Sequence, residues 1–375
     1  MRLTFPMSLL LTAAAFPAMA EISLYGEARL GLGYNIDNEG EPNLETKESV
    51  VIRDDDGLRT VVTELGGSDD LRAVSRLRFG VTMTGESDSG VTFGASIRAD
   101  NAHNGGTGPS AATGQTAGDV FVAGAFGRLS YGDVDGADYM RVGDPVENVS
   151  LTGLGDFNEL PFMSNGGGSD NDSLQFVTDP DGLPTVRYDY DIGGFGLSVS
   201  TDRTLDSVGA GASYVHEFAS GPTILLGLGY YDFSSFTGDL TNYGEVEVPD
   251  GEEWSASLRG EIGAFNAGVG YAAIDAGDLG KLDVLSVGAG ATQGPWTGVL
   301  YYTRVISGDD LFGAAYDGRD SYGASLAYDL GGGAQVRAGV ARSYGADAID
   351  DPAQTPYAPA VEAMTLADFG ITMAF

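Results

Sequence analysis

Hydrophobic and polar residues alternate along residues 75–99, and this pattern predicts a two-stranded hairpin. On the first strand Leu77, Phe79 and Val81 fall on one face, between polar or small residues on the other. Residues 87–90, with the sequence SDSG, form a tight polar turn. Period-2 alternation with one apolar face is typical of a sheet that is wetted on one side only. The apolar face must therefore cover either a protein core or lipid.

The same unit recurs along the chain, and short connections alternate with long ones. One opening strand, seven hairpins and one closing strand predict an all-β, 16-stranded antiparallel transmembrane barrel with short periplasmic turns and long outer loops. An even strand number lets the first and last strands pair, which leaves no open edge. The predicted strands span residues 21–34, 75–86, 91–99, 119–126, 128–133, 185–191, 195–201, 207–218, 223–236, 254–262, 265–275, 281–292, 296–307, 321–330, 334–344 and 362–375.

The first 20 residues have the pattern of a secretory signal peptide. Arg2 precedes an apolar run over residues 7–20 that ends in Ala18, Met19 and Ala20, an A-x-A cleavage signature. This run is too short to cross a bilayer as a helix, although a retained N-terminal anchor is the alternative. We therefore predict a signal peptide at residues 1–20 and a barrel at residues 21–375.

Composition narrows the possible environments and partners. A formal net charge of −35 makes nucleic acid an unsuitable partner. The chain has no cysteine, which excludes a disulfide-stapled scaffold. No segment after the leader is an apolar run of helix-spanning length, so membrane insertion after export would require a closed barrel.

Aromatic residues gather at the strand ends next to the short turns. A lipid–water interface attracts such rings, whereas a soluble sandwich has no reason to place them at one level. These residues are Phe126, Phe195, Phe218, Phe265, Trp296 and Phe375.

Three segments resemble the general diffusion porins of Gram-negative bacteria, especially those of alphaproteobacteria. They are EISLYGEARLGLGY at residues 21–34, the hairpin at residues 75–98 and ADFGITMAF at residues 367–375. The resemblance implies an outer-membrane homotrimer of 16-stranded barrels surrounded by lipid. It also implies that the third long loop, here residues 134–183, folds into the barrel and narrows it. Phe375 would be the terminal aromatic that the outer-membrane assembly machinery uses.

A barrel of this size encloses a water-filled lumen, so its inward face should be polar. Arg29, Arg76, Arg78 and Arg98 fall on the wet face of the first three strands. We expect acids of the third loop to oppose them and to set up a transverse field that filters solutes by charge at a pore constriction. The alternative is that these are ordinary wet-face charges. The candidate acids are Asp144, Glu147, Asp156, Glu159, Asp170 and Asp172.

Metal and enzyme chemistry have little support in the sequence. Acidic residues at 53–57 and 67–70 offer carboxylate oxygens for calcium, but without ordered ligand spacing, so solvated loop charge is the plainer interpretation. The only histidines, His103 and His216, have no paired acid or nucleophile. We expect no catalytic residue, no cofactor and no resident metal, with loop-bound calcium as the open alternative.

Three functions remain after these exclusions. The first is a passive channel for small hydrophilic solutes and ions, which filters them by size and charge. The second is a substrate-specific channel on the same fold, but aromatics on the wet face, such as Tyr25 and Tyr231, are too scattered to form a sugar track. The third is a secreted calcium-binding repeat protein, which would need nonapeptide repeats that do not recur here.

Overall fold

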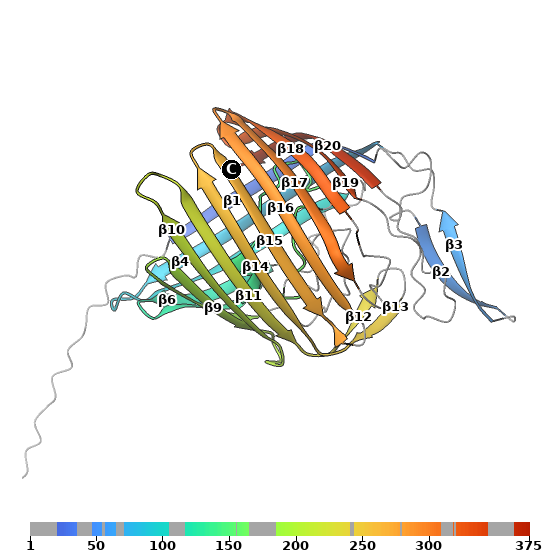
Figure 1. Cartoon of the computed structure of the whole chain (residues 1–375), viewed down its shortest axis with the longest axis horizontal. Helices are drawn as coiled ribbons and strands as arrows, with labels where there is room; N and C mark the ends of the chain where they lie inside the picture. Colours follow the sequence, from blue (N-terminus) through green and yellow to red (C-terminus); the bar gives the residue numbers. More distant parts are fainter. Residues whose placement is uncertain are drawn as a thin grey trace, which may run out of the picture.

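The chain forms one closed antiparallel barrel of 16 strands (Figure 1). The computed structural model describes residues 21–35, 47–54, 57–64, 71–104, 117–154, 156–164, 185–240, 244–277, 280–308, 318, 320–343 and 364–375. The predicted signal peptide at residues 1–20 lies outside these ranges. Within them, no helix is long and apolar enough to cross a membrane.

The barrel strands follow chain order, and the last one returns to pair with the first. Their bounds are β1 (Glu21–Asn35), β4 (Leu71–Glu86), β5 (Thr92–Asn104), β6 (Ala117–Gly124), β7 (Gly127–Gly132), β8 (Val186–Ile192), β9 (Phe195–Thr201), β10 (Val208–Glu217), β11 (Thr223–Phe233), β14 (Gly251–Ile262), β15 (Phe265–Asp275), β16 (Lys281–Gln293), β17 (Trp296–Gly308), β18 (Asp320–Gly331), β19 (Ala334–Ser343) and β20 (Met364–Ala374).

Pairing of β1 with β20 closes the barrel. The register runs from Glu27 opposite Ala374 to Asn35 opposite Leu366. Beyond the ladder, the Phe375 N–H donates to the Gly26 carbonyl at 2.8 Å. Because every barrel strand has two neighbours, no edge of the sheet is left open. The predicted fold class is therefore confirmed.

The alternating pattern places the apolar residues on the outside. Gly31 faces Leu151, which lies inside the barrel, so the neighbouring Leu30 and Leu32 of β1 point outward. Both leucines are exposed, as are Leu77 and Phe79 of β4. An exposed apolar band around a closed barrel is the surface that a bilayer requires.

Aromatic side chains flank this band at both ends. All six predicted turn-side aromatics are exposed, and Trp296 packs against Tyr328 with ring centroids 4.6 Å apart. His216 also lies at this level, between Tyr214 and Phe218. A second group of aromatic residues, which was not predicted, lies near the loop end. Its members are Tyr230, Trp254, Tyr271, Tyr302 and Tyr322.

The long connections differ from the prediction in two ways. The polar segment after β1 contains a separate two-stranded sheet of β2 (Lys47–Asp54) and β3 (Gly57–Glu64), beside the loop end of the barrel (Figure 1). Likewise, β12 (Phe236–Leu240) pairs with β13 (Gly244–Val248). By contrast, the connections from β9 to β10 and from β15 to β16 are short, so the predicted strict alternation of short and long connections is wrong.

We predict that a charge on the outer face destabilises the barrel and that one on the inner face does not. Leu228 of β11 points outward and is 63% exposed, whereas Ser213 of β10 points inward. Leu228→Arg should cost about 2–4 kcal/mol, because it places a charge in hydrocarbon. Ser213→Arg is the control and should cost much less. Guanidinium unfolding in lipid vesicles measures both, and equal losses would contradict the outward orientation of Leu228.

Candidate functional site

The connection between β7 and β8, called loop 3 below, runs inside the barrel. It begins after Gly132, includes the helix α1 (Ala137–Val142) and is described as far as residue 164. Its first pass contacts the inner wall in order, from Ser200 on β9 to Asp368 on β20. The loop therefore lies along the inner wall from β9 to β20, as the resemblance implied.

Glycines on the inner wall allow this close approach. A side chain at Gly211 would overlap the Ala137 carbonyl, and one at Gly227 would overlap the Arg141 carbonyl. Backbone therefore lies on backbone where the wall carries no side chain. The Gly-x-Gly pair of Gly227 and Gly229 within β11 therefore serves close approach of the loop to the wall. Other glycines of the wall lie against loop side chains, such as Leu151 and Val146. The glycines that face loop 3 are Gly31, Gly211, Gly227, Gly229, Gly268, Gly270, Gly288, Gly339 and Gly370.

Serines between these glycines hold the loop backbone. Ser200 Oγ accepts from the Ala137 N–H at 2.9 Å, and Ser257 Oγ donates to the Val142 carbonyl at 2.7 Å. Farther along the wall, Ser286 Oγ donates to the Asn158 carbonyl and Ser325 Oγ accepts from the Val149 N–H. Short hydroxyl side chains satisfy the backbone of a loop that has little secondary structure of its own.

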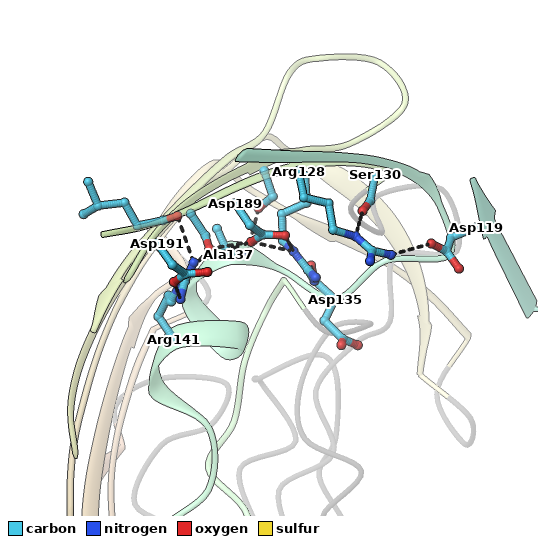
Figure 2. A network of polar contacts seen from close by, with 12 residues as sticks. Asp119, Arg128, Ser130, Asp135, Ala137, Arg141, Asp189 and Asp191 are labelled. Atoms are coloured by element: carbon cyan, nitrogen blue, oxygen red, sulfur yellow. Dashed lines mark hydrogen bonds and ion pairs between the residues drawn. The ribbon is translucent and has the colours of Figure 1, made fainter. Parts of the chain in front are cut away.

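Arg141 fixes α1 to the wall at β8 and β9, as Figure 2 shows. Its guanidinium donates to Ser198 Oγ at 2.7 Å, to the Leu197 carbonyl at 3.0 Å and to Asp191 at 2.8 Å. Asp189 lies 4.0 Å away and also pairs with Arg187 at 3.0 Å. Arg141 is 8% exposed, so its bonds to Ser198 and Leu197 are shielded from water, whereas Asp191 is itself exposed.

The tip of loop 3 is bound at β1 and β20. Arg29 Nη1 donates to the Leu151 carbonyl at 3.1 Å. The Thr152 N–H and Oγ1 both donate to Asp368, at 2.7 and 2.8 Å. The tip of loop 3 therefore contacts β1, the first of the strands that carry the arginines.

The return pass packs on apolar residues of the inner wall. Leu160 and Phe162 pack with Val142 and with wall residues such as Val284. Phe157 is in a second cluster, with Val146 and Tyr301. The prediction of a uniformly polar inner face is therefore wrong at β15–β17, because loop 3 covers those strands and keeps water away from them.

The four predicted arginines do lie together, on the opposite part of the wall. Arg29 of β1 is paired in register with Arg76 of β4, and Arg98 of β5 lies opposite Gly80 of β4. Arg78 shares the inner face two residues from Arg76. Glu27, which the sequence analysis did not select, forms an ion pair with Arg76 and lowers the repulsion within the group.

Two further inner-face arginines follow on the next strands. Arg128 of β7 lies over the ring of Phe121, 3.7 Å from its centroid, and approaches Asp119 at 3.5 Å (Figure 2). Arg187 of β8 pairs with Asp189. The same wet-face alternation that selected Arg29 applies to these strands, so both were accessible to sequence reasoning.

The predicted acids of loop 3 occupy different environments. Asp144 accepts from the Leu160 N–H at 3.1 Å and so links the two passes of the loop. Glu147 is exposed, and Glu159 is partly buried. Asp156 interacts electrostatically with Arg29. Asp170 and Asp172 lie outside the described residues, and the role of the whole set at a constriction stays a prediction.

Metal binding receives no new support from the described part of the chain. It contains no group of three or more histidine, aspartate or glutamate side chains placed to hold a metal ion. The acidic segments at 53–57 and 67–70 lie outside the residues whose side chains the structure describes.

A closed 16-stranded barrel with an apolar exterior and an in-folded loop defines the class of transmembrane channels that cross the outer membrane with strands. The family model for Gram-negative porins matches residues 8–348, and the chain belongs to that family. A porin of Rhodobacter capsulatus is 28% identical over 349 residues, which cover 86% of this chain and 94% of that protein.

Solved structures agree on the fold. A porin structure refined at 1.8 Å resolution matches with a TM-score of 0.61 at 23% identity, covering 95% of this chain and all of that one. A triple mutant of Rhodopseudomonas blastica porin matches with a TM-score of 0.56 at 19% identity, with the same coverage. The protein is thus a porin of the Gram-negative outer membrane, and its barrel is a channel for diffusion.

We predict that Gly211→Ala destabilises the protein by about 1–3 kcal/mol, because the new methyl group forces loop 3 off the wall. Gly298→Ala is the matched control, since its methyl group would meet Leu326 at an ordinary 3.7 Å. Guanidinium unfolding in detergent micelles measures the difference. Equal stability of the two variants would contradict the close contact at Gly211.

Loss of Arg141 should be costly as well. Arg141→Ala removes the donor to Ser198, to the Leu197 carbonyl and to Asp191, and we expect a loss of about 3 kcal/mol. Arg141→Lys should recover only part of it, because an ammonium group cannot reproduce the planar fork. Lys281→Ala breaks an exposed ion pair with Asp275 and should cost under about 1 kcal/mol. The same unfolding assay ranks the three variants.

Proposed function

We propose that the channel filters small hydrophilic solutes and ions at a constriction between loop 3 and the arginines Arg29, Arg76, Arg78 and Arg98. The observation that carries this proposal is the hydrogen bond from Arg29 to the Leu151 carbonyl. It brings the arginine-bearing wall and the tip of loop 3 to one level of the lumen. Charges held on two sides of a narrow passage act on every ion that crosses it.

Three of the predicted loop acids support a transverse field. Glu147, Asp156 and Glu159 belong to the described part of loop 3 inside the barrel, and Asp156 interacts with Arg29. Asp144 contributes less, because its carboxylate accepts a bond from the loop backbone. Such a field orients dipolar solutes and slows apolar ones, which have no charge or dipole to align.

Passive diffusion is favoured over a substrate-specific track. Tyr231, one of the wet-face aromatics noted in the sequence, is 2% exposed and stacks on Phe233 with ring centroids 6.2 Å apart. It therefore does not present a ring face to passing solutes. Solutes that pass through the channel would instead contact arginine and carboxylate groups of the inner wall. Passive diffusion requires no catalytic step.

We also propose that the protein is a homotrimer and that Phe375 is its assembly signal. The resemblance to the family supports the trimer. The 77% exposed side chain of Phe375 on the outer face supports recognition of that ring. The mass of the purified protein in detergent, by light scattering, tests the trimer. Deletion of Phe375 tests the signal through the amount of folded barrel in the outer membrane.

Neutralising the arginines should make the channel more selective for cations. A unit charge a few ångströms from the ion path in a wet environment is worth about 1 kcal/mol, or about a fivefold change in the cation-to-anion permeability ratio. We expect a shift of at least this size for the Arg76→Ser, Arg78→Ser double variant, which removes two charges, and a shift the other way for Glu147→Gln. Reversal potentials in planar bilayers under a salt gradient measure both.

The control is Arg304→Ser, because Arg304 lies on the outer face, where Asp320 approaches it at 3.7 Å. Its removal should leave the reversal potential unchanged. A shift of equal size in the control and the double variant would contradict the proposed filter, as would no shift in any variant.

A further inference from the structure

Two acidic side chains are fully buried where loop 3 meets the wall. Asp138 comes from α1 and Glu253 from β14, and both are 0% exposed. Neighbouring residues of the return pass donate to them. Ser164 Oγ donates to Asp138 Oδ2 at 2.7 Å, and the Met163 N–H donates to Glu253 Oε2 at 2.5 Å. Both passes of loop 3 and the wall therefore meet at one pair of carboxyl groups.

Each carboxyl group has a second oxygen without a donor. Asp138 Oδ1 and Glu253 Oε1 are buried and unpaired, and so is Ser255 Oγ beside them on β14. Gly229 of β11 closes the space, since a methyl group there would lie 2.8 Å from the Asp138 Cβ. A buried carboxylate oxygen that lacks a donor is costly, so these atoms require a further partner.

The surrounding elements supply no cation to the pair among the described residues. Arg141, on the same helix, is bound to Ser198, Leu197 and Asp191 at β8–β9. Arg259 of β14 lies against Gly143 instead.

The remaining neighbours are neutral or already bonded. From β9, Ser200 is bonded to Ala137, and from β11 the ring of Tyr231 lies against Gly209 of β10. Ala272 and Ile274 of β15 are apolar and buried. The nearby connection from β9 to β10 carries Asp202, Arg203 and Asp206, and Asp202 accepts bonds from its own turn.

Asp138 and Glu253 interact electrostatically, and two buried carboxylates without a cation cannot both be ionised at an acceptable cost. Burial raises the pKa of Asp138 to about 6, despite the hydrogen bond from Ser164. A retained proton would serve as the missing donor for one of the two orphan oxygens. A calcium ion would need six to eight oxygen ligands, whereas this closed site offers about three.

We propose that Asp138 and Glu253 share one proton, and that this protonated pair is the positioning contact that holds α1 and residues 163–164 of loop 3 against β14. Docking of loop 3 is then strongest at acid pH. It weakens as the pH rises and the shared proton leaves, because the protonated form of an acid with a raised pKa is the one that the folded protein favours. Both residues position the loop and need not touch a passing solute.

Infrared difference spectroscopy of the full-length barrel in detergent tests the proton directly. The wild-type protein should show the C=O stretch of a protonated carboxyl group near neutral pH, and the band should disappear at alkaline pH. Asp138→Asn and Glu253→Gln should each remove it. Absence of the band from the wild-type protein throughout the range from about pH 5 to pH 9 would overturn the proposal, and this result does not depend on any variant folding.

Asp202→Asn is the matched control, because Asp202 is also buried. Burial disfavours its ionisation, but hydrogen bonds from Ser207, Thr204 and Asp206 outweigh that effect and lower the pKa of Asp202. The control should therefore keep the infrared band. Loss of the band in Asp202→Asn but not in Asp138→Asn would assign the proton elsewhere and overturn the proposal.

Noise in single-channel current tests whether the pair holds loop 3 in position. Wild-type current should become noisier as the pH rises through the range in which the infrared band disappears. In Asp138→Asn, whose amide group can donate to Glu253, the noise should stay low at every pH. Wild-type pH dependence in this variant would contradict the pair, as would stabilisation of wild-type docking by added calcium. The infrared result stands even if the proposed charge filter fails, so the two proposals can be separated.

Discussion

The channel depends on one contact, in which loop 3 lies directly on the glycines of the inner wall. That contact exists because β10, β11, β15, β16 and β19 carry glycine where the loop passes, with serines between them that bond to its carbonyl and amide groups. On β1, β4 and β5 the same inner face carries long arginine side chains instead. Among the described residues, side-chain size therefore separates the part of the wall that loop 3 covers from the part that carries the arginines.

The outer surface follows from a different requirement. In lipid every backbone amide and carbonyl needs a partner within the protein, and ring closure between β1 and β20 supplies it. Since period-2 alternation separates the two faces completely, the outside can be apolar with aromatic rings at both ends while the inside carries arginine, serine and glycine. Within one strand, the positions that face lipid are therefore apolar, and the positions between them, which face the lumen, are mostly polar or small.

Sequence reasoning was strong where the information is local. Alternation located all sixteen barrel strands, and it placed Arg29, Arg76, Arg78 and Arg98 on one inner face. It did not find the path of loop 3, because bonds such as Thr152 to Asp368 join residues 216 positions apart. For the same reason it did not find the bond by which Asp144 accepts from the Leu160 N–H, 16 positions away. The buried pair of Asp138 and Glu253 gave no signal, since acids in a porin sequence are common and only burial distinguishes these two.

Disulfide trapping of loop 3 tests the central claim most directly, because the chain has no cysteine of its own. A Cβ at Gly339 would lie 2.6 Å from the Ser150 Cβ, so a shift of about 1 Å allows a disulfide between Ser150→Cys and Gly339→Cys. We predict that the bond forms on oxidation and that conductance equals that of the wild type before and after reduction. Ser150→Cys with Gly298→Cys, on the outer face, should not crosslink. Failure of the inner pair to crosslink, or a rise in its conductance on reduction, would contradict a loop that rests on the wall.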